Sequence, residues 1–131
     1  MPPAARRNVL IVEDDPQLRD FYKTALRAAG YAVIAVEDGA DALRQIDFAS
    51  PAAVVLDLAL PRVGGRDVHY ELKARSATQR IPIVVVTGTD TSDLDEKQFA
   101  CVLRKPVQPD DLVAAVEQCI RRAATGSILS P

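Results

Sequence analysis

The chain of 131 residues is long enough for one domain with one hydrophobic core. Its 48% hydrophobic and 26% charged residues are typical of a folded domain and argue against disorder. The formal net charge of -2 offers no electrostatic attraction to nucleic acid or to anionic membranes, and no apolar run approaches the ~20 residues of a membrane span.

We therefore expect a cytoplasmic domain with no direct binding to nucleic acid or membrane. Residues 8–123 are predicted to form this domain, between a flexible N-terminal segment at 1–7 and a flexible C-terminal tail at 124–131. Two cysteines, Cys101 and Cys119, lie in apolar patterns. Buried, reduced thiols are the favoured interpretation, and a disulfide or a reactive thiol is the alternative.

Apolar runs alternate with helical patterns along the first half of the chain. A strand at 9–12 precedes a helix that Asp15 is suited to cap, with Pro16 as its first residue and Gly30 as its stop. A second strand follows at 32–36, a short helix at 39–49 and a third strand at 52–57. This succession is typical of strand–helix–strand units in a parallel sheet.

The second half continues the alternation. A helix is predicted at 65–75, and a strand at 83–86 is apolar throughout, as expected for a strand buried on both faces. The stretch 89–100 is polar and poorly periodic. A short strand near 101–106 and a last helix beginning near Pro109 complete the pattern. We predict a doubly wound α/β fold, with five parallel strands and helices on both faces of the sheet.

Charged or hydroxyl side chains follow all five predicted strands, but the second strand, followed by Glu37 and Asp38, is expected at the edge of the sheet, away from the others. Glu13 and Asp14 follow the first strand, Asp57 ends the third, Thr87 ends the fourth and Lys105 ends the fifth. Because the carboxyl ends of parallel strands meet at one edge of the sheet, where such folds bind ligands, these residues are expected to converge.

Carboxylates brought close together repel one another unless a positive charge intervenes. Mg²⁺ prefers oxygen ligands and is commonly held by one or two carboxylates together with water and phosphate oxygens. Lys105 could neutralise a phosphoryl oxygen and the Thr87 hydroxyl could donate to another, which is the stabilisation that phosphoryl transfer requires. A carboxylate can also act as the nucleophile and form an aspartyl phosphate.

Four segments in this order resemble the receiver domain of two-component response regulators. They are VLIVEDD at 9–15, VVLDLALPRVGG at 54–65, IPIVVVTG at 81–88 and LRKPV at 103–107, and the resemblance runs from about residue 8 to residue 122. It implies a (βα)5, flavodoxin-like fold with strand order 2-1-3-4-5.

The resemblance also implies roles for individual residues. Asp57 would be the phosphoacceptor, and Thr87 and Lys105 would hold phosphoryl oxygens. Mg²⁺, or Mn²⁺ in its place, would be held by Asp14, Asp57 and the backbone carbonyl of Ala59, and by Glu13 through water. The Lys105–Pro106 bond would be cis, and Pro61 and Gly65 would shape the loop after Asp57, where glycine can adopt a positive φ.

The reaction implied is acceptance of a phosphoryl group from a sensor histidine kinase or a histidine phosphotransfer protein, followed by slow autodephosphorylation. The chain would not act as an enzyme on other molecules. Phosphorylation would change its conformation and thereby control a downstream protein, and a homodimer is a further possible assembly. Arg19, Lys23 and Arg27 are candidates for docking the phosphodonor, with a merely solvated face as the favoured interpretation.

Two departures from the family pattern concern how activation is transmitted. The family often has an aromatic residue three positions before the lysine, where this chain has Val102. The stretch between Thr87 and Lys105 is also shorter than is usual in the family, which implies that the fourth helix is short or irregular. We therefore expect the signal to leave by another surface, or by a change in the Thr87 loop alone. Ala59 is also less polar than is common at its position. The only histidine, His69, is expected at the surface.

Other functions remain open at this point. A degenerate receiver could serve as a binding module independent of phosphorylation, although the five site residues are all present. A haloacid-dehalogenase-like phosphatase would need a second acid where Ala59 stands. A flavodoxin-like cofactor binder would need a phosphate-binding loop after the first strand, and the acidic EDDPQ segment disfavours that.

Overall fold

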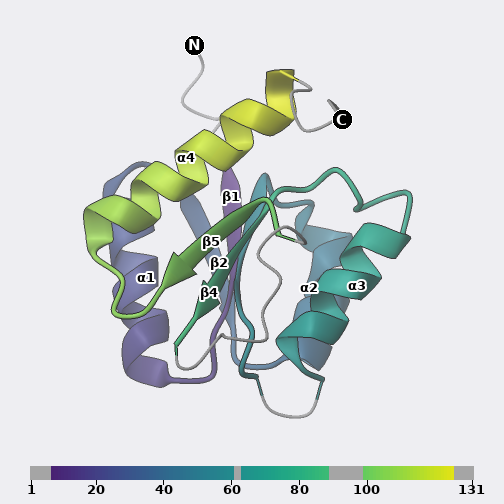
Figure 1. Cartoon of the computed structure of the whole chain (residues 1–131), viewed down its shortest axis with the longest axis horizontal. Coiled ribbons are helices and arrows are strands. Elements are labelled where there is room, and N and C mark those ends of the chain that lie inside the picture. The colour runs from purple at the N-terminus through teal and green to yellow at the C-terminus, as the bar shows by residue number, and fades with distance from the viewer. Residues whose placement is uncertain (1–6, 61–62, 89–98, 126–131) are drawn as a thin grey trace.

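The computed structural model describes residues 7–60, 63–88 and 99–125. Five parallel strands form one sheet in the order β2-β1-β3-β4-β5, which confirms the predicted topology (Figure 1). The strands are β1 (Asn8–Val12), β2 (Ala32–Val36), β3 (Ala53–Asp57), β4 (Ile83–Thr87) and β5 (Cys101–Arg104). The helices of the described part are α1 (Pro16–Ala28), α2 (Gly39–Ala49), α3 (Gly65–Ala74) and α4 (Pro109–Thr125).

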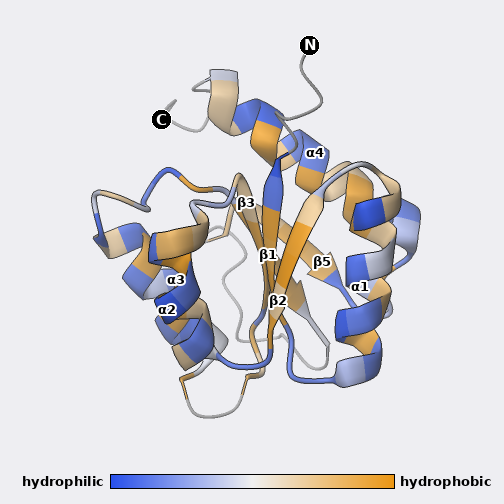
Figure 2. Ribbon diagram, turned by 180° about the vertical axis from the view of Figure 1, so that it is seen from behind, coloured by the Kyte–Doolittle hydropathy of each residue, from blue (hydrophilic) through white to orange (hydrophobic). Residues whose placement is uncertain are grey.

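Helices cover both faces of the sheet. Helices α1 and α4 lie on one face, and α2 and α3 lie on the other (Figure 1). Successive strand residues point to opposite faces, so Val9 and Ile11 pack under α1 and α4, whereas Leu10 and Val12 pack under α2 and α3. Figure 2 shows the apolar strands between helices whose polar residues lie outward. The three central strands are therefore apolar on both faces, except at Asn8, Asp57 and Thr87, which lie at strand ends.

The boundaries of α1 follow from the predicted capping residues. The Asp15 side chain accepts hydrogen bonds from the backbone nitrogens of Gln17 and Leu18, and Pro16 is the first helical residue. After the helix, Gly30 has a φ of 101°, which a residue with a Cβ adopts only at a cost. The chain can therefore reverse direction here and enter β2.

Some predictions about segments are corrected or fall outside the described residues. Helix α4 continues to Thr125, so the tail cannot begin at 124 as predicted, because the last helical turn extends over those positions. The predicted short helix within 89–98, the tail beyond 125, Pro61 and most of the N-terminal segment lie outside the described residues. Within the described ranges, no helix has the length and hydropathy needed to cross a membrane.

The prediction of reduced cysteine thiols is wrong for this structure. Cys101 on β5 and Cys119 on α4 form a disulfide. Both cysteines belong to the apolar layer between the sheet and α4, and this shared environment made burial predictable. Their pairing depends on how α4 crosses β5, and this crossing cannot be predicted from the apolar pattern of either segment.

Candidate functional site

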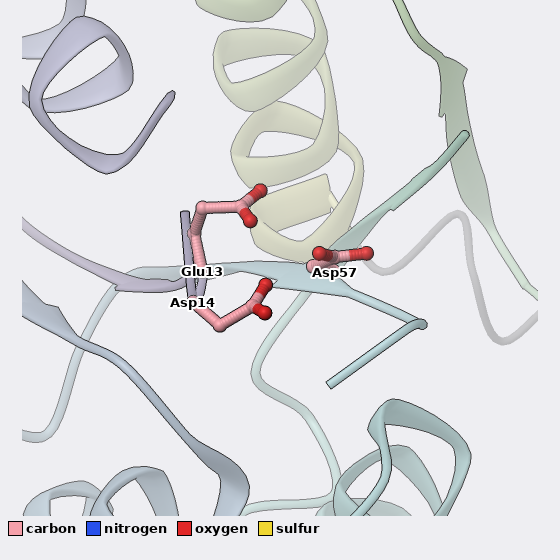
Figure 3. Close-up of side chains that lie close together, drawn as sticks. All are labelled: Glu13, Asp14 and Asp57. Atoms are coloured by element: carbon pink, nitrogen blue, oxygen red, sulfur yellow. The ribbon is translucent and has the colours of Figure 1, made fainter. Parts of the chain in front are cut away.

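Three carboxylates meet at the carboxyl end of the central strands. Glu13 and Asp14 directly follow β1, and Asp57 is the last residue of β3. The register that pairs Val12 with Leu56 places Glu13 beside Asp57. One oxygen from each of the three carboxylates lies within 4.8 Å of the others. Figure 3 shows Glu13 and Asp14 extending from the end of β1 toward Asp57.

Glu13 is the most deeply buried member of the cluster. Its exposed fraction is 1%, and one of its oxygens accepts a hydrogen bond from the backbone nitrogen of Asp15 at 3.2 Å. Its other oxygen, Oε1, is buried and accepts no hydrogen bond from the described residues. Burial, and to a lesser degree the negative charge of Asp57, raise the pKa of Glu13 to about 7.

Lys105 provides the positive charge of the site. Its ammonium nitrogen lies 3.4 Å from Oδ2 of Asp57 and 3.4 Å from Oε1 of Glu13. Burial opposes the charge of Lys105, but the carboxylates of Asp57 and Glu13 outweigh it and raise the pKa of the lysine. The Lys105–Pro106 peptide bond is cis, as the family resemblance implied. One lysine charge thus faces two buried carboxylates, which leaves net negative charge.

Backbone groups orient Asp57 and Lys105. The other Asp57 oxygen, Oδ1, accepts a hydrogen bond from the backbone nitrogen of Ala59 at 3.0 Å. The backbone nitrogen of Lys105 donates to the carbonyl of Thr87 at 2.9 Å, which joins the ends of β4 and β5. Thr87 is 7% exposed at the end of β4. All the residues predicted for the site therefore lie at the same edge of the sheet.

The oxygen-rich donor set fits a hard divalent cation. Three carboxylates converge, one of their buried oxygens lacks a hydrogen-bond partner, and a single lysine leaves part of their charge uncompensated. Oxygen ligands of this kind suit Mg²⁺ rather than a softer metal, which would prefer sulfur or imidazole. The cluster thus offers the kind of oxygen ligands that a hard divalent cation prefers.

Gly65 is needed for close packing rather than for an unusual backbone conformation. Glycine can adopt a positive φ in the loop after Asp57, but among the described glycines only Gly30 does so. A Cβ on Gly65 would instead overlap the backbone of Asp57 and Leu58. The start of α3 can therefore lie directly against the end of β3 and support Asp57.

Two residues near the site were not predicted for it. Arg19 was expected to point outward, but its guanidinium donates to the carbonyl oxygens of Glu13 at 3.0 Å and Asp14 at 3.4 Å. The Tyr22 hydroxyl is buried and has no hydrogen-bond partner in the part of the chain that the structure describes, and burial together with the charge of Glu13 raises its pKa. The position of Arg19 in the first turns of α1, directly after the acidic segment, could have predicted its contact with that segment.

The surroundings of β5 bear on the predictions for His69 and Val102. His69 lies at the surface, as predicted, but is partly covered, because its ring meets the buried Phe99 edge-on with centroids 4.7 Å apart. Burial lowers the pKa of His69, and the charge of Lys73 lowers it further. Val102 lies on β5 and packs against the core under α2 and α3.

The comparisons with known proteins agree with this geometry. The family model described as "Response regulator receiver domain" matches residues 9–117. The DNA-binding response regulator MtrA of Mycolicibacterium smegmatis is 37% identical over 121 residues, which cover 89% of this chain and 52% of MtrA. The sensory transduction protein RegX3 of Mycobacterium tuberculosis is 37% identical over 120 residues, covering 88% of this chain and 51% of RegX3. The chain thus spans about half the length of these relatives.

A solved structure extends the likeness to three dimensions. The receiver domain of a sensor histidine kinase from Pseudomonas aeruginosa superimposes with a TM-score of 0.77 at 26% identity, covering 89% of this chain and 99% of that one. That structure has a magnesium ion coordinated in its active site cleft.

Proposed function

Because this chain belongs to the response regulator receiver domain family, we propose that it accepts a phosphoryl group on Asp57 and thereby switches conformation. The main support is the contact of Lys105 with Asp57 beside the carboxylates of Glu13 and Asp14. This arrangement combines a nucleophile, a fixed cation and a set of oxygen ligands, which are the parts that phosphoryl transfer requires.

We assign the metal site to Glu13, Asp14, Asp57 and the backbone carbonyl of Ala59. Mg²⁺ is the favoured cation and Mn²⁺ the substitute, because both prefer oxygen ligands. The cation would neutralise charge on the phosphoryl oxygens. The buried Oε1 of Glu13 lies 3.4 Å from the Lys105 ammonium but has no hydrogen-bond partner among the described residues, which supports a role in holding the cation, directly or through a bound water.

The chain's own residues would act as follows. A carboxylate oxygen of Asp57 attacks phosphorus, an O–P bond forms, and the N–P bond to the donor histidine breaks. Lys105 pairs with one phosphoryl oxygen and the Thr87 hydroxyl donates to another. The Ala59 amide, which binds Oδ1 of Asp57, and Gly65, which packs under the Asp57 backbone, hold the nucleophile in place. Hydrolysis by water later releases phosphate, so the domain would catalyse only its own modification.

We propose a sensor histidine kinase or a histidine phosphotransfer protein as the phosphodonor, and an effector protein as the downstream partner. The chain would act in the cytoplasm, with a homodimer as one possible signalling form. MtrA is by name a DNA-binding protein, and we do not transfer that property to this chain, which covers about half of MtrA. A binding module that does not depend on phosphorylation is disfavoured, because such a module would not need Lys105 to be held 3.4 Å from Oδ2 of Asp57.

The test is phosphorylation by acetyl phosphate with Mg²⁺, followed by mass spectrometry. We expect the chain to gain one phosphoryl group at Asp57, and we expect chelation of the metal or Asp57→Asn to abolish the gain. Asp20→Asn is the matched control, because Asp20 is an exposed acid on α1, paired with Lys23 at 4.0 Å. Equal labelling of the Asp57→Asn variant and the original chain would refute the assignment.

A further inference from the structure

The disulfide between Cys101 and Cys119 joins the edge strand β5 to helix α4. Cys119 is 3% exposed in the apolar layer under α4, whereas Cys101, the first residue of β5, is partly exposed. Their Cα atoms lie 6.8 Å apart, a separation at which a disulfide can close without backbone movement. One sulfur is therefore sheltered and the other lies closer to solvent.

The segment that this bond closes carries Lys105. The two cysteines are separated by 18 positions, and Lys105 follows directly after the end of β5. Strand β5 is held to β4 from the Val84–Cys101 pair to the Thr87–Arg104 pair, and the Lys105 amide then donates to the Thr87 carbonyl. The disulfide thus fixes one end of a short strand whose other end presents the site lysine.

A groove beside β5 provides access to the partly exposed cysteine. It has a volume of about 520 Å³ and is lined by Cys101, Arg104, Gln118 and Arg122, among others. This volume lies within the range of small-molecule sites. A low-molecular-weight thiol or disulfide could therefore reach β5 near Cys101.

We propose that Cys101 and Cys119 form a redox-active pair whose oxidation state is coupled to phosphoryl binding at Asp57. Oxidation would proceed by exchange with a low-molecular-weight disulfide. The Cys101 thiolate attacks one sulfur of that disulfide and releases the first thiol, and the Cys119 thiolate then attacks the Cys101 sulfur and releases the second. Two electrons and two protons pass from the cysteines to the external disulfide, and excess thiol reverses the reaction.

The redox chemistry depends only on the two cysteines, whereas its coupling to Asp57 rests on the proposed function. The bond restrains β5 against α4 and so limits the positions open to the Lys105 backbone. A lysine already held near Asp57 loses less conformational freedom when it pairs with a phosphoryl oxygen. We therefore expect tighter phosphoryl binding in the disulfide form. Because coupling between two sites is reciprocal, phosphoryl binding should favour the disulfide by the same factor.

The experiment compares the oxidised and reduced forms of the full 131-residue chain. The disulfide form is prepared with excess glutathione disulfide and the dithiol form with excess reduced dithiothreitol, and each is identified by its mass and by alkylation of free thiols. Beryllofluoride with Mg²⁺, which mimics the phosphoryl group, is then titrated while NMR signals of the site are monitored. We expect the disulfide form to bind beryllofluoride about fivefold more tightly or better, which is the lower end of typical coupling.

Equal or weaker binding in the disulfide form would overturn the coupling while leaving the proposed function intact. Failure of the pair to interconvert under thiol and disulfide would overturn the redox activity. Absence of beryllofluoride binding in both forms would instead refute the proposed function, and the coupling with it. Cys101→Ala and Cys119→Ala are the controls. Each must abolish the effect of the oxidant on affinity, and an effect that persists would place the oxidation elsewhere and overturn the proposal.

Discussion

The ammonium nitrogen of Lys105 lies 3.4 Å from Oδ2 of Asp57, although 48 positions separate the two residues in the chain. The same nitrogen lies 3.4 Å from Oε1 of Glu13. In the absence of other cations, this lysine is the counterion of both carboxylates. A divalent metal bound at the site would therefore share this negative charge with the lysine. Under the proposed function, a phosphoryl group on Asp57 would be neutralised by both cations.

Lys105→Met should separate these two roles. Without the lysine charge, Mg²⁺ meets less repulsion, and we expect it to bind more tightly. Binding of beryllofluoride should weaken by about 10- to 150-fold, the equivalent of one lost hydrogen bond to a charged group. Calorimetric titration of Mg²⁺, followed by NMR titration of beryllofluoride, measures both effects. Lys73→Met is the control, because Lys73 instead donates to the carbonyls of Gln79 and Ile81. Parallel weakening of metal and beryllofluoride binding would contradict the assignment.

Glu13 should make the metal-free protein less stable as pH rises. Its pKa is about 7 in the folded chain and 4.5 in a model peptide, so between these values the folded state binds more protons than the unfolded state. The stabilising contribution of protonated Glu13 is therefore fully present below about pH 4.5 and is lost as the pH rises through about 7. The free energy of unfolding should fall by on the order of 3 kcal/mol across this window.

Urea unfolding of the chelated protein at several pH values measures this contribution. Glu13→Gln, which cannot ionise, should remove the decrease, so the difference in free energy of unfolding between the two chains should change across this window. A constant difference between them would show that the Glu13 pKa is close to its ordinary value.

Gly65→Ala should destabilise the fold because the new methyl group would overlap the backbone of Asp57 and Leu58. We expect a loss of about 2–3 kcal/mol in the free energy of unfolding, as for other overpacked positions. Gly64→Ala is a close control, since the nearest atom to its added Cβ is Asp67 Oδ2 at 3.9 Å. That control should cost no more than about 1 kcal/mol, the usual range for a change at an N-cap. Similar losses in both variants would contradict the close approach at Gly65.

Ser50→Gly should stabilise the protein without touching the site. Ser50 ends α2 with a φ of 43°, in the left-handed region that disfavours residues with a Cβ. Relief of this cost should raise the free energy of unfolding by roughly 1 kcal/mol. Thermal or urea unfolding measures the change, and Ser50→Ala, which keeps the Cβ, should give no gain. An equal gain in both variants would place the effect in the serine hydroxyl instead.

The local sequence pattern was sufficient to predict the strands and the functional residues at their ends. The apolar runs before Glu13, Asp57 and Thr87 indicated buried parallel strands, and all such strands end at one edge of the sheet. The helix starts at Pro16 and Gly39 were also predictable, because capping depends on residues that lie a few positions apart. Interactions of such short range can be predicted from neighbouring residues alone.

The sequence by itself therefore determined the order of the elements and the edge at which the functional side chains lie. Only the tertiary structure decided that Cys101 bonds to Cys119, that Gly65 must lack a Cβ and that Arg19 turns inward to the carbonyls of Glu13 and Asp14. The physical reason is that each of these contacts depends on how an element crosses another, to within about an ångström. Packing of the whole core sets that geometry, and no short stretch of residues encodes it.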